Sequence, residues 1–204
     1  MTQLPWTPVV YLPVDLTVRF DADVLTAADP GPWCQRKAAE LLSPDATPRQ
    51  VSRLTRCLEE YAAHFGSERP LIAAAVFFYP DFRTIPARAM AKVKAFGEHS
   101  VAGPLTMAQM REIFEQPDEL SFGEMEMTET EVPAGPALRV HRYRKAEPGK
   151  RRSHIGEELV WIIWPPESTT VVSLETRWME PMFSKAAISI ADDMARNFRT
   201  KWEG

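Results

Sequence analysis

Six basic residues gather in one short stretch of the chain, and they form its most distinctive chemical feature: Arg142, Arg144, Lys145, Lys150, Arg151 and Arg152. The chain of 204 residues has a formal net charge of −4, so this stretch has the opposite sign to the molecule as a whole. Cations at this density could hold a phosphate, a nucleic-acid backbone or an acidic protein face. Because the small net charge creates no long-range attraction to nucleic acid or to an anionic membrane, an acidic protein face is the favoured partner.

Local charge pairing offers a simpler interpretation of the same stretch. The preceding segment carries a run of acidic residues: Glu115, Asp118, Glu119, Glu124, Glu126, Glu129 and Glu131. An antiparallel hairpin would set several of these opposite Arg139, Arg142 or Lys145, and such cross-strand pairs contribute about 0.2–1 kcal/mol each. Residues 150–152 lie beyond this compensation, either on a solvated loop or on a binding surface.

Acid–base chemistry is a second possibility in this region. His141 and His154 flank the basic stretch, and Glu126 or Glu129 could lie close to them. An imidazole beside a carboxylate can act as a general acid or base. The stretch offers only Ser153 as a nucleophile, without the sequence of a nucleophile elbow. Two surface histidines are therefore the favoured interpretation, and a small hydrolase or other enzyme with a histidine–carboxylate site is the alternative.

The other chemically active residues form no recognisable motif. Cys34 and Cys57 stand alone on separate predicted helices, which favours two buried, reduced thiols over a metal site or a disulfide. Asp192 and Asp193 are adjacent on a predicted helix, where consecutive side chains diverge by about 100° and cannot share a metal ion by themselves. We therefore expect no metal, no cofactor and no catalytic residue.

The apolar pattern predicts the elements that must position these side chains. Alternation and continuous apolar runs predict strands at residues 9–20, 71–79, 89–96, 122–132, 138–146, 159–164 and 169–178. Helical spacing and capping signals predict helices at residues 29–42, 47–66, 106–116 and 183–202. Pro13 places the first strand at a sheet edge or at a bulge. The fold class is α+β: a mostly antiparallel, twisted sheet with packed helices in one domain, residues 1–204, with a helical insertion near residues 29–66.

Three tryptophans suggest a second partner site. Trp161 and Trp164 have opposite parity on one predicted strand, so they should face opposite sides of the sheet. If helices cover only one face, one of them stays on the open face near Trp178 and forms an exposed aromatic patch. The alternative is that the helices of residues 29–66, or a loop, cover that face.

From residue 70 to residue 204, the order of elements resembles the Mog1/PsbP-like α/β/α sandwich family. The matching features are the apolar strand at 75–79, the helix at 106–115, the turn at 132–136, the strand pair within 158–178 and the final helix at 183–199. The family includes a nuclear cofactor of a small GTPase, photosystem accessory subunits, mycobacterial lipoproteins and chaperones of secreted effectors. The resemblance therefore implies binding rather than turnover, although it carries no diagnostic motif and assigns no residue a role.

Together these patterns predict a cytoplasmic, non-catalytic protein-binding module, such as an adaptor, accessory factor or chaperone. The chain has neither a secretory start nor a run of about 18 apolar residues that would span a membrane. The partner is a protein with an acidic face, bound through an open sheet face and the basic hairpin end. The predicted partner-binding residues are Arg142, Arg144, Lys145, Lys150, Arg151, Arg152, Trp161, Trp164 and Trp178. A structural homo-oligomer joined at the edge strand, residues 12–20, is the second alternative.

Overall fold

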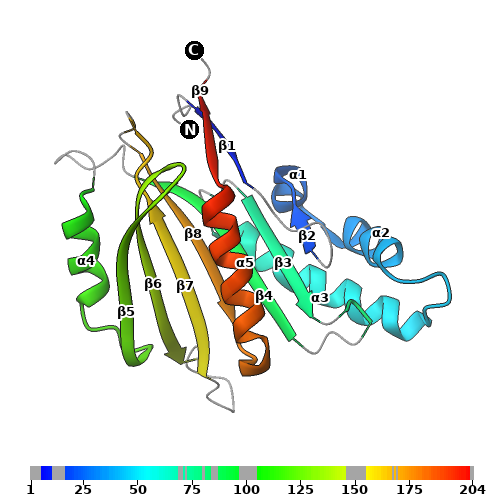
Figure 1. Cartoon of the computed structure of the whole chain (residues 1–204). Helices are drawn as coiled ribbons and strands as arrows, with labels where there is room; N and C mark the ends of the chain where they lie inside the picture. Colours follow the sequence, from blue (N-terminus) through cyan, green and yellow to red (C-terminus); the bar gives the residue numbers. More distant parts are fainter. Residues whose placement is uncertain are drawn as a thin grey trace.

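A seven-stranded antiparallel sheet forms the centre of the molecule (Figure 1). The computed structural model describes residues 6–10, 17–68, 71, 73–79, 81–83, 87–96, 105–145, 155–166, 168 and 170–202. The strands, in the order in which they lie side by side, are Thr17–Phe20 (β2), Ala73–Tyr79 (β3), Ala87–Phe96 (β4), Val171–Trp178 (β8), Ile155–Ile163 (β7), Gly135–Lys145 (β6) and Ser121–Val132 (β5). Each neighbouring pair is antiparallel, which confirms the predicted α+β class.

Five α-helices accompany this sheet in the described part of the chain: Ala22–Thr26 (α1), Gly31–Leu41 (α2), Pro48–Ser67 (α3), Met107–Glu115 (α4) and Ser184–Asn197 (α5), the last preceded by the 3₁₀ turn Pro181–Phe183 (η1). The two predicted capping boxes are confirmed. The Thr47 hydroxyl accepts the backbone N–H of Gln50 at the start of α3, and Thr106 does the same for Gln109 at α4. These bonds satisfy donors that a helix start leaves free. None of the helices described here has the length and apolar character to cross a membrane.

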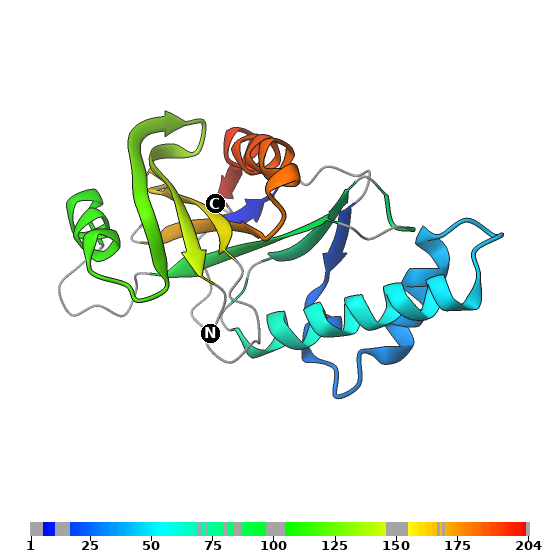
Figure 2. The same cartoon turned by 90° about the horizontal axis from the view of Figure 1, so that it is seen from below.

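Helices cover both faces of the sheet, with α5 on one side and α3 on the other (Figure 2). The side chains of β3 point alternately into the apolar clusters on the two faces of the sheet. Ala75 and Phe77 belong to the apolar cluster under α5, whereas Val76 and Phe78 belong to the cluster under α2 and α3. Side chains of successive strand residues point to opposite faces. The continuous apolar run at residues 71–79 therefore marks a strand covered on both sides, as predicted.

The sheet face opposite α5 carries two separate apolar clusters. One lies at the β2–β3 end, beneath α1, α2 and α3. The other lies at the β5–β7 end, where Met110 of α4 packs with Leu138, Val140, Val160 and Ile162. The strands β4 and β8 run between the two clusters. A strip across the middle of this face, between α3 and α4, therefore belongs to neither apolar cluster, and we call this strip the channel.

The end of the chain differs from the prediction. The closing helix was predicted to reach residue 202, but α5 ends at Asn197 because Phe198 adopts an extended backbone and buries its ring completely in the core. The last described residues, Arg199–Trp202, form β9, which pairs with Trp6–Val9 (β1) in a separate two-stranded sheet. The predicted strand at 9–20 is thus divided between β1 and β2, and residues 11–16 lie outside the described part. β2 is an edge strand of the described sheet, and Pro13, on which the expected edge or bulge depended, lies outside the described residues.

Candidate binding site between α3 and α4

Nine charged side chains cross the sheet in the channel between α3 and α4. From the α3 side to the β5 side they are Glu68, Lys92, Lys94, Glu175, Arg177, Glu158, Arg142, Arg144 and Asp118, and we call this set the charged row. Their position follows from alternation along the strands. Val93 and Leu174, which stand next to row residues in sequence, point into the cluster under α5. The row residues of β4 and β8 therefore project from the opposite face.

Glu158 lies at the centre of the charged row and is only 1% exposed. Its Oε2 accepts a hydrogen bond from Arg142 Nε at 2.6 Å and lies 3.5 Å from Arg144 Nη1. Its other carboxylate oxygen, Oε1, accepts from Arg177 Nε. Burial alone would raise the pKa of Glu158, but the charges of Arg177, Arg142 and Arg144 outweigh burial and lower it. Glu158 is therefore an ionised carboxylate held by three guanidinium groups.

Lys92 forms a second buried centre on the α3 side of the channel. Its side chain is 1% exposed, and its Nζ donates to Glu68 Oε2 at 2.5 Å and lies 3.5 Å from Glu175 Oε2. Lys94 Nζ lies 3.0 Å from the same Glu68 oxygen. Burial would raise the pKa of Glu68, but hydrogen bonds and charge from both lysines lower it to about 2. Glu68 directly follows α3, so this ion cluster ties the end of the helix to β4 and β8.

Burying the charges of this row costs free energy of folding. Glu158 and Lys92, each 1% exposed, lose nearly all of their hydration, and the attraction of their neighbours offsets that loss only when the geometry is good. Other members keep part of their hydration, such as Arg177 at 34% exposed and Asp118 at 31%. Apolar residues of similar volume would often stabilise the same position as well or better. Buried charges in a channel are therefore candidates for a functional site.

A cleft of about 150 Å³ opens beside the charged row, against α4. Its lining combines apolar residues, Met110, Phe114, Val160 and Ile162, with polar and charged residues, Arg142, Glu158, Ser173, Glu175 and Arg177. The guanidinium carbon of Arg142 lies 5.2 Å from the centre of the Phe114 ring, a cation–π contact that joins the two parts. The cleft is suited to a side chain or short segment with both apolar and charged parts.

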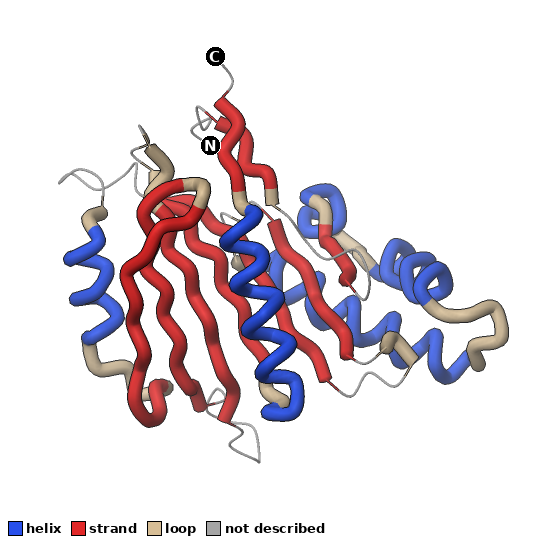
Figure 3. The backbone as a smooth tube through the Cα atoms, in the orientation of Figure 1, coloured by secondary structure: helices blue, strands red, loops and turns tan. Residues whose placement is uncertain are grey.

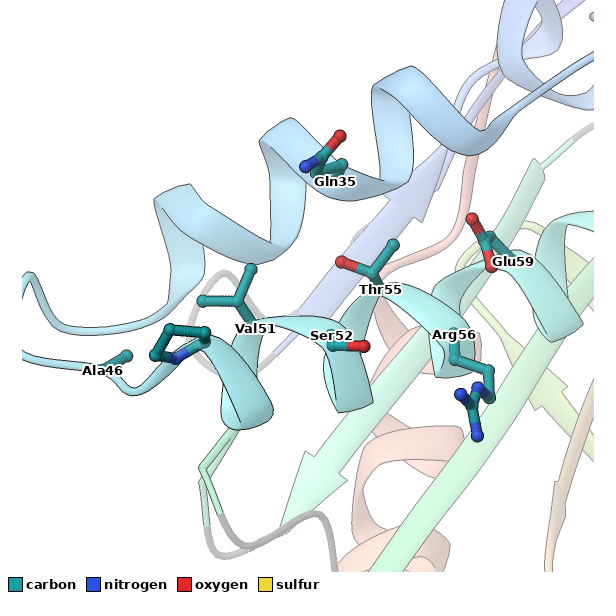
Figure 4. Close-up of a pocket in the computed structure, with 8 residues that line it drawn as sticks. Gln35, Ala46, Val51, Ser52, Thr55, Arg56 and Glu59 are labelled. Atoms are coloured by element: carbon teal, nitrogen blue, oxygen red, sulfur yellow. The ribbon is translucent and has the colours of Figure 1, made fainter.

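A larger hollow, of about 520 Å³, lies between α2 and α3. The residues that line it are Gln35, Ala46, Pro48, Val51, Ser52, Thr55, Arg56 and Glu59 (Figure 4). Figure 4 shows Gln35 on α2 and the other labelled side chains spread along α3 and the segment before it, without converging on one point. This hollow is a shallow groove between helices and lacks the convergent polar groups of a ligand site.

The predicted histidine–carboxylate contact exists, but its partner and geometry differ from the prediction. His141 Nε2 lies 3.1 Å from Glu157 Oε2, and Ser184 Oγ donates to the same oxygen at 2.8 Å. Glu126 is more distant, with 3.9 Å between its Oε2 and His141 Nδ1. A catalytic serine must be bonded to its base, and here serine and imidazole both bond to the carboxylate. His154 and Ser153 lie outside the described residues.

The predicted basic cluster is divided by the structure. Arg142 and Arg144 belong to the charged row, where they contact Asp118 and Glu158. The predicted local pairing is thus correct for Asp118, whereas Glu158 comes from the next strand. Lys145 is exposed at the end of β6. Lys150, Arg151 and Arg152 lie outside the described residues.

The exposed aromatic patch predicted from the tryptophans is wrong. Trp161 and Trp178 are 6% and 2% exposed and lie in the cluster under α5, and the indole N–H of Trp161 donates to Asp192 of that helix at 3.1 Å. Trp164 is half-buried with the α4 cluster, and its indole donates to the carbonyl of Leu105 at 2.6 Å. The prediction that Trp161 and Trp164 face opposite sides of the sheet is confirmed. These three tryptophans form no exposed patch because helices cover both faces of the sheet, with α5 over Trp161 and Trp178 and α4 beside Trp164.

Most of the charged row was not predicted from the sequence, although the strands carry a signal for it. Along β8, Ser173, Glu175 and Arg177 alternate with Leu174, Thr176 and Trp178, and along β4 Lys92 and Lys94 alternate with apolar residues. Polar alternation on strands at the centre of a helix-covered sheet indicates a polar stripe between the covering helices.

The remaining reactive groups are structural. Cys34 and Cys57 are buried free thiols, as predicted. Burial, with a smaller effect of nearby carboxylates, raises the pKa of Cys34 to about 11, so it is a poor nucleophile. Within the described ranges, no group of three or more His, Cys, Asp and Glu side chains could hold a metal ion.

Comparison with known proteins adds no assignment: no protein-family model matches the chain, and no curated protein is significantly similar to it in sequence.

Proposed function

We propose that the protein is a non-catalytic protein-binding module that receives an acidic segment of a partner protein in the channel between α3 and α4. One observation carries this proposal: charged side chains, including the nearly fully buried Glu158 and Lys92, occupy a channel that lies between two apolar clusters on one sheet face. A core built only for stability would place apolar residues there.

The charged row favours an acidic partner for two reasons. It has one more cation than carboxylates among the nine members defined above. In addition, a guanidinium group has five N–H donors, so Arg177, whose side chain is 34% exposed, retains donors after bonding Glu158. Lys94, nearer the α3 side of the row, is also partly exposed. Both cations are held in place before binding, which lowers the entropic cost of forming new ion pairs.

The enzyme alternative receives less support. His141, the histidine to which the sequence pointed, belongs to the sheet face under α5, where its ring stacks on Trp178 with 6.2 Å between ring centres. It therefore lies on the opposite face from the charged row. Catalysis of the predicted kind would require the imidazole and the nucleophile to be in hydrogen-bond contact.

Affinity capture with matched variants tests the proposal. The test variant is Lys94→Gln with Arg177→Gln, and the control is Arg36→Gln with Arg53→Gln, which removes the same charge from exposed positions on α2 and α3. Circular dichroism establishes that each variant is folded. We expect one or more proteins, with acidic segments, to be retained by the wild type and the control but lost by the test variant. Identical retention by all three forms contradicts the proposal.

A further inference from the structure

The strand β5 forms one edge of the sheet. Among the strands that the structure describes, it is the last of the seven, pairs with β6 alone and has 12 residues (Figure 3, outermost strand on the left). The side chains of residues 128–131 are all exposed. α4 packs on the sheet face beside this strand through contacts that include Met125 and Met127. A strand edge with exposed backbone donors and acceptors can pair with another chain.

The hydrogen bonds of the next strand show which backbone groups of β5 point outward. Trp164 N–H donates to the carbonyl oxygen of Pro136 at 2.9 Å, so the backbone of Pro136 faces β7. Pro136 stands opposite Glu131. In an antiparallel pair, two opposite residues either both bond to each other or both face away, so the N–H and C=O of Glu131 face away from β6. Alternation extends this orientation to Glu129 and Met127.

Two features protect this edge from a second copy of the same chain. A bulge shifts the register between Phe122 and Glu126, with Gly123 at φ 75°, and limits the regular edge to residues 126–132. β5 also carries Glu124, Glu126, Glu129 and Glu131 and no basic residue. Like charges on neighbouring strands are destabilising. Two β5 strands would therefore repel each other.

The same charges favour a strand of opposite sign. Glu129 already accepts a hydrogen bond from Arg111 of α4 at 3.1 Å, which shows that a guanidinium group can reach this row of carboxylates. Glu129 and Glu131 are two positions apart, so their side chains lie on the same face. A paired strand with basic residues at alternate positions would place one cation beside each.

We propose that the edge of β5 at residues 126–132 binds an extended basic segment of a partner protein as an eighth strand. The backbone groups of Met127, Glu129 and Glu131 supply the hydrogen bonds, and the carboxylates select the charge. This surface is separate from the channel between α3 and α4, and its occupation does not depend on the function proposed for the channel.

Fluorescence anisotropy with defined peptides tests the proposal. The probe is a labelled octapeptide of alternating lysine and valine, and the control peptide alternates glutamate and valine. We expect only the lysine peptide to bind, and hydrogen exchange followed by NMR should show new protection of the Met127, Glu129 and Glu131 amides. No binding of the lysine peptide at millimolar concentration, or equal binding of both peptides, overturns the proposal.

Two variants separate strand pairing from simple charge attraction. Glu131→Pro removes an outward N–H without breaking a bond to β6, and we expect it to weaken binding about tenfold. Glu131→Gln keeps the N–H and should weaken binding about two- to fivefold. Glu60→Gln removes one exposed charge on α3, at the opposite end of the sheet from β5, and should have no effect. Equal affinity of the proline and glutamine variants contradicts strand pairing. If the proline variant does not fold, the amide protection in the wild type decides the question.

Discussion

Replacing Glu158 by glutamine should destabilise the protein more than any removal of a surface charge. Glu158→Gln preserves the size of the side chain and removes its charge. Arg142, Arg144 and Arg177 then face a neutral group in a position that is 1% exposed. Breaking a buried ion pair by removing one partner costs about 3–5 kcal/mol, because the remaining charges stay buried without compensation.

The remaining contacts of the three arginines place the expected loss at the low end of this range. Arg144 Nη2 lies 3.0 Å from Asp118 Oδ2, and Arg142 lies 3.8 Å from it. Arg177 keeps a contact of 3.9 Å with Glu175. We therefore expect the free energy of unfolding to fall by about 3 kcal/mol. A domain with a typical stability of about 5–15 kcal/mol would remain folded.

Urea unfolding followed by far-ultraviolet circular dichroism measures this loss. The matched control is Glu129→Gln, which removes an exposed ion pair with Arg111 and should cost about 1 kcal/mol or less. The double variant Glu158→Gln with Arg177→Gln should be less destabilised than the sum of the single variants, by about 1–3 kcal/mol. If Glu158→Gln costs no more than the control, Glu158 does not hold the charged row together.

Two further predictions concern the ends of α3 and α5. The lysines beside Glu68 lower its pKa from 4.5 to about 2, so the stability that it contributes is present above pH 4.5 and is lost as the pH falls through about 2. Urea titrations at pH values from 7 to 2 test this. Glu68→Gln should be less stable than the wild type at neutral pH and nearly equal to it at pH 2. Asp192→Ala should lower the free energy of unfolding by about 1–3 kcal/mol, because Asp192 accepts hydrogen bonds from Arg139 and from the buried indole N–H of Trp161. The control Asp193→Ala breaks only an exposed pair with Arg196 and should change the free energy of unfolding by less than about 0.5 kcal/mol in the same assay.

Local signals in the sequence were sufficient to predict the framework of the fold. The capping boxes at Thr47 and Thr106 placed the starts of α3 and α4, since each depends on residues only three positions apart. The apolar run of β3 predicted a strand covered on both faces. Such features are local or periodic, so they can be recognised without knowledge of the partners of each strand.

The charged row could not be predicted in the same way, because it depends on strand order. Lys92 meets Glu175 because β4 pairs with β8, and Glu158 meets Arg177 because β7 also pairs with β8. A shift of one residue in either register would send these side chains to the other face. The burial of Trp161 similarly depends on where α5 crosses the sheet, which is a tertiary choice that the residues of β7 alone do not specify.

The pairing of β1 with β9 has a practical consequence for engineering the molecule. Trp6 stands opposite Trp202, so the chain enters and leaves this small sheet at the same end (Figure 1). Peptide joined at residue 6 and peptide joined at residue 202 would therefore start side by side. A short linker could join these two points, and the chain could be cut at another loop to give a circular permutant. Its new termini could be placed near either proposed binding surface, where a label could then be attached.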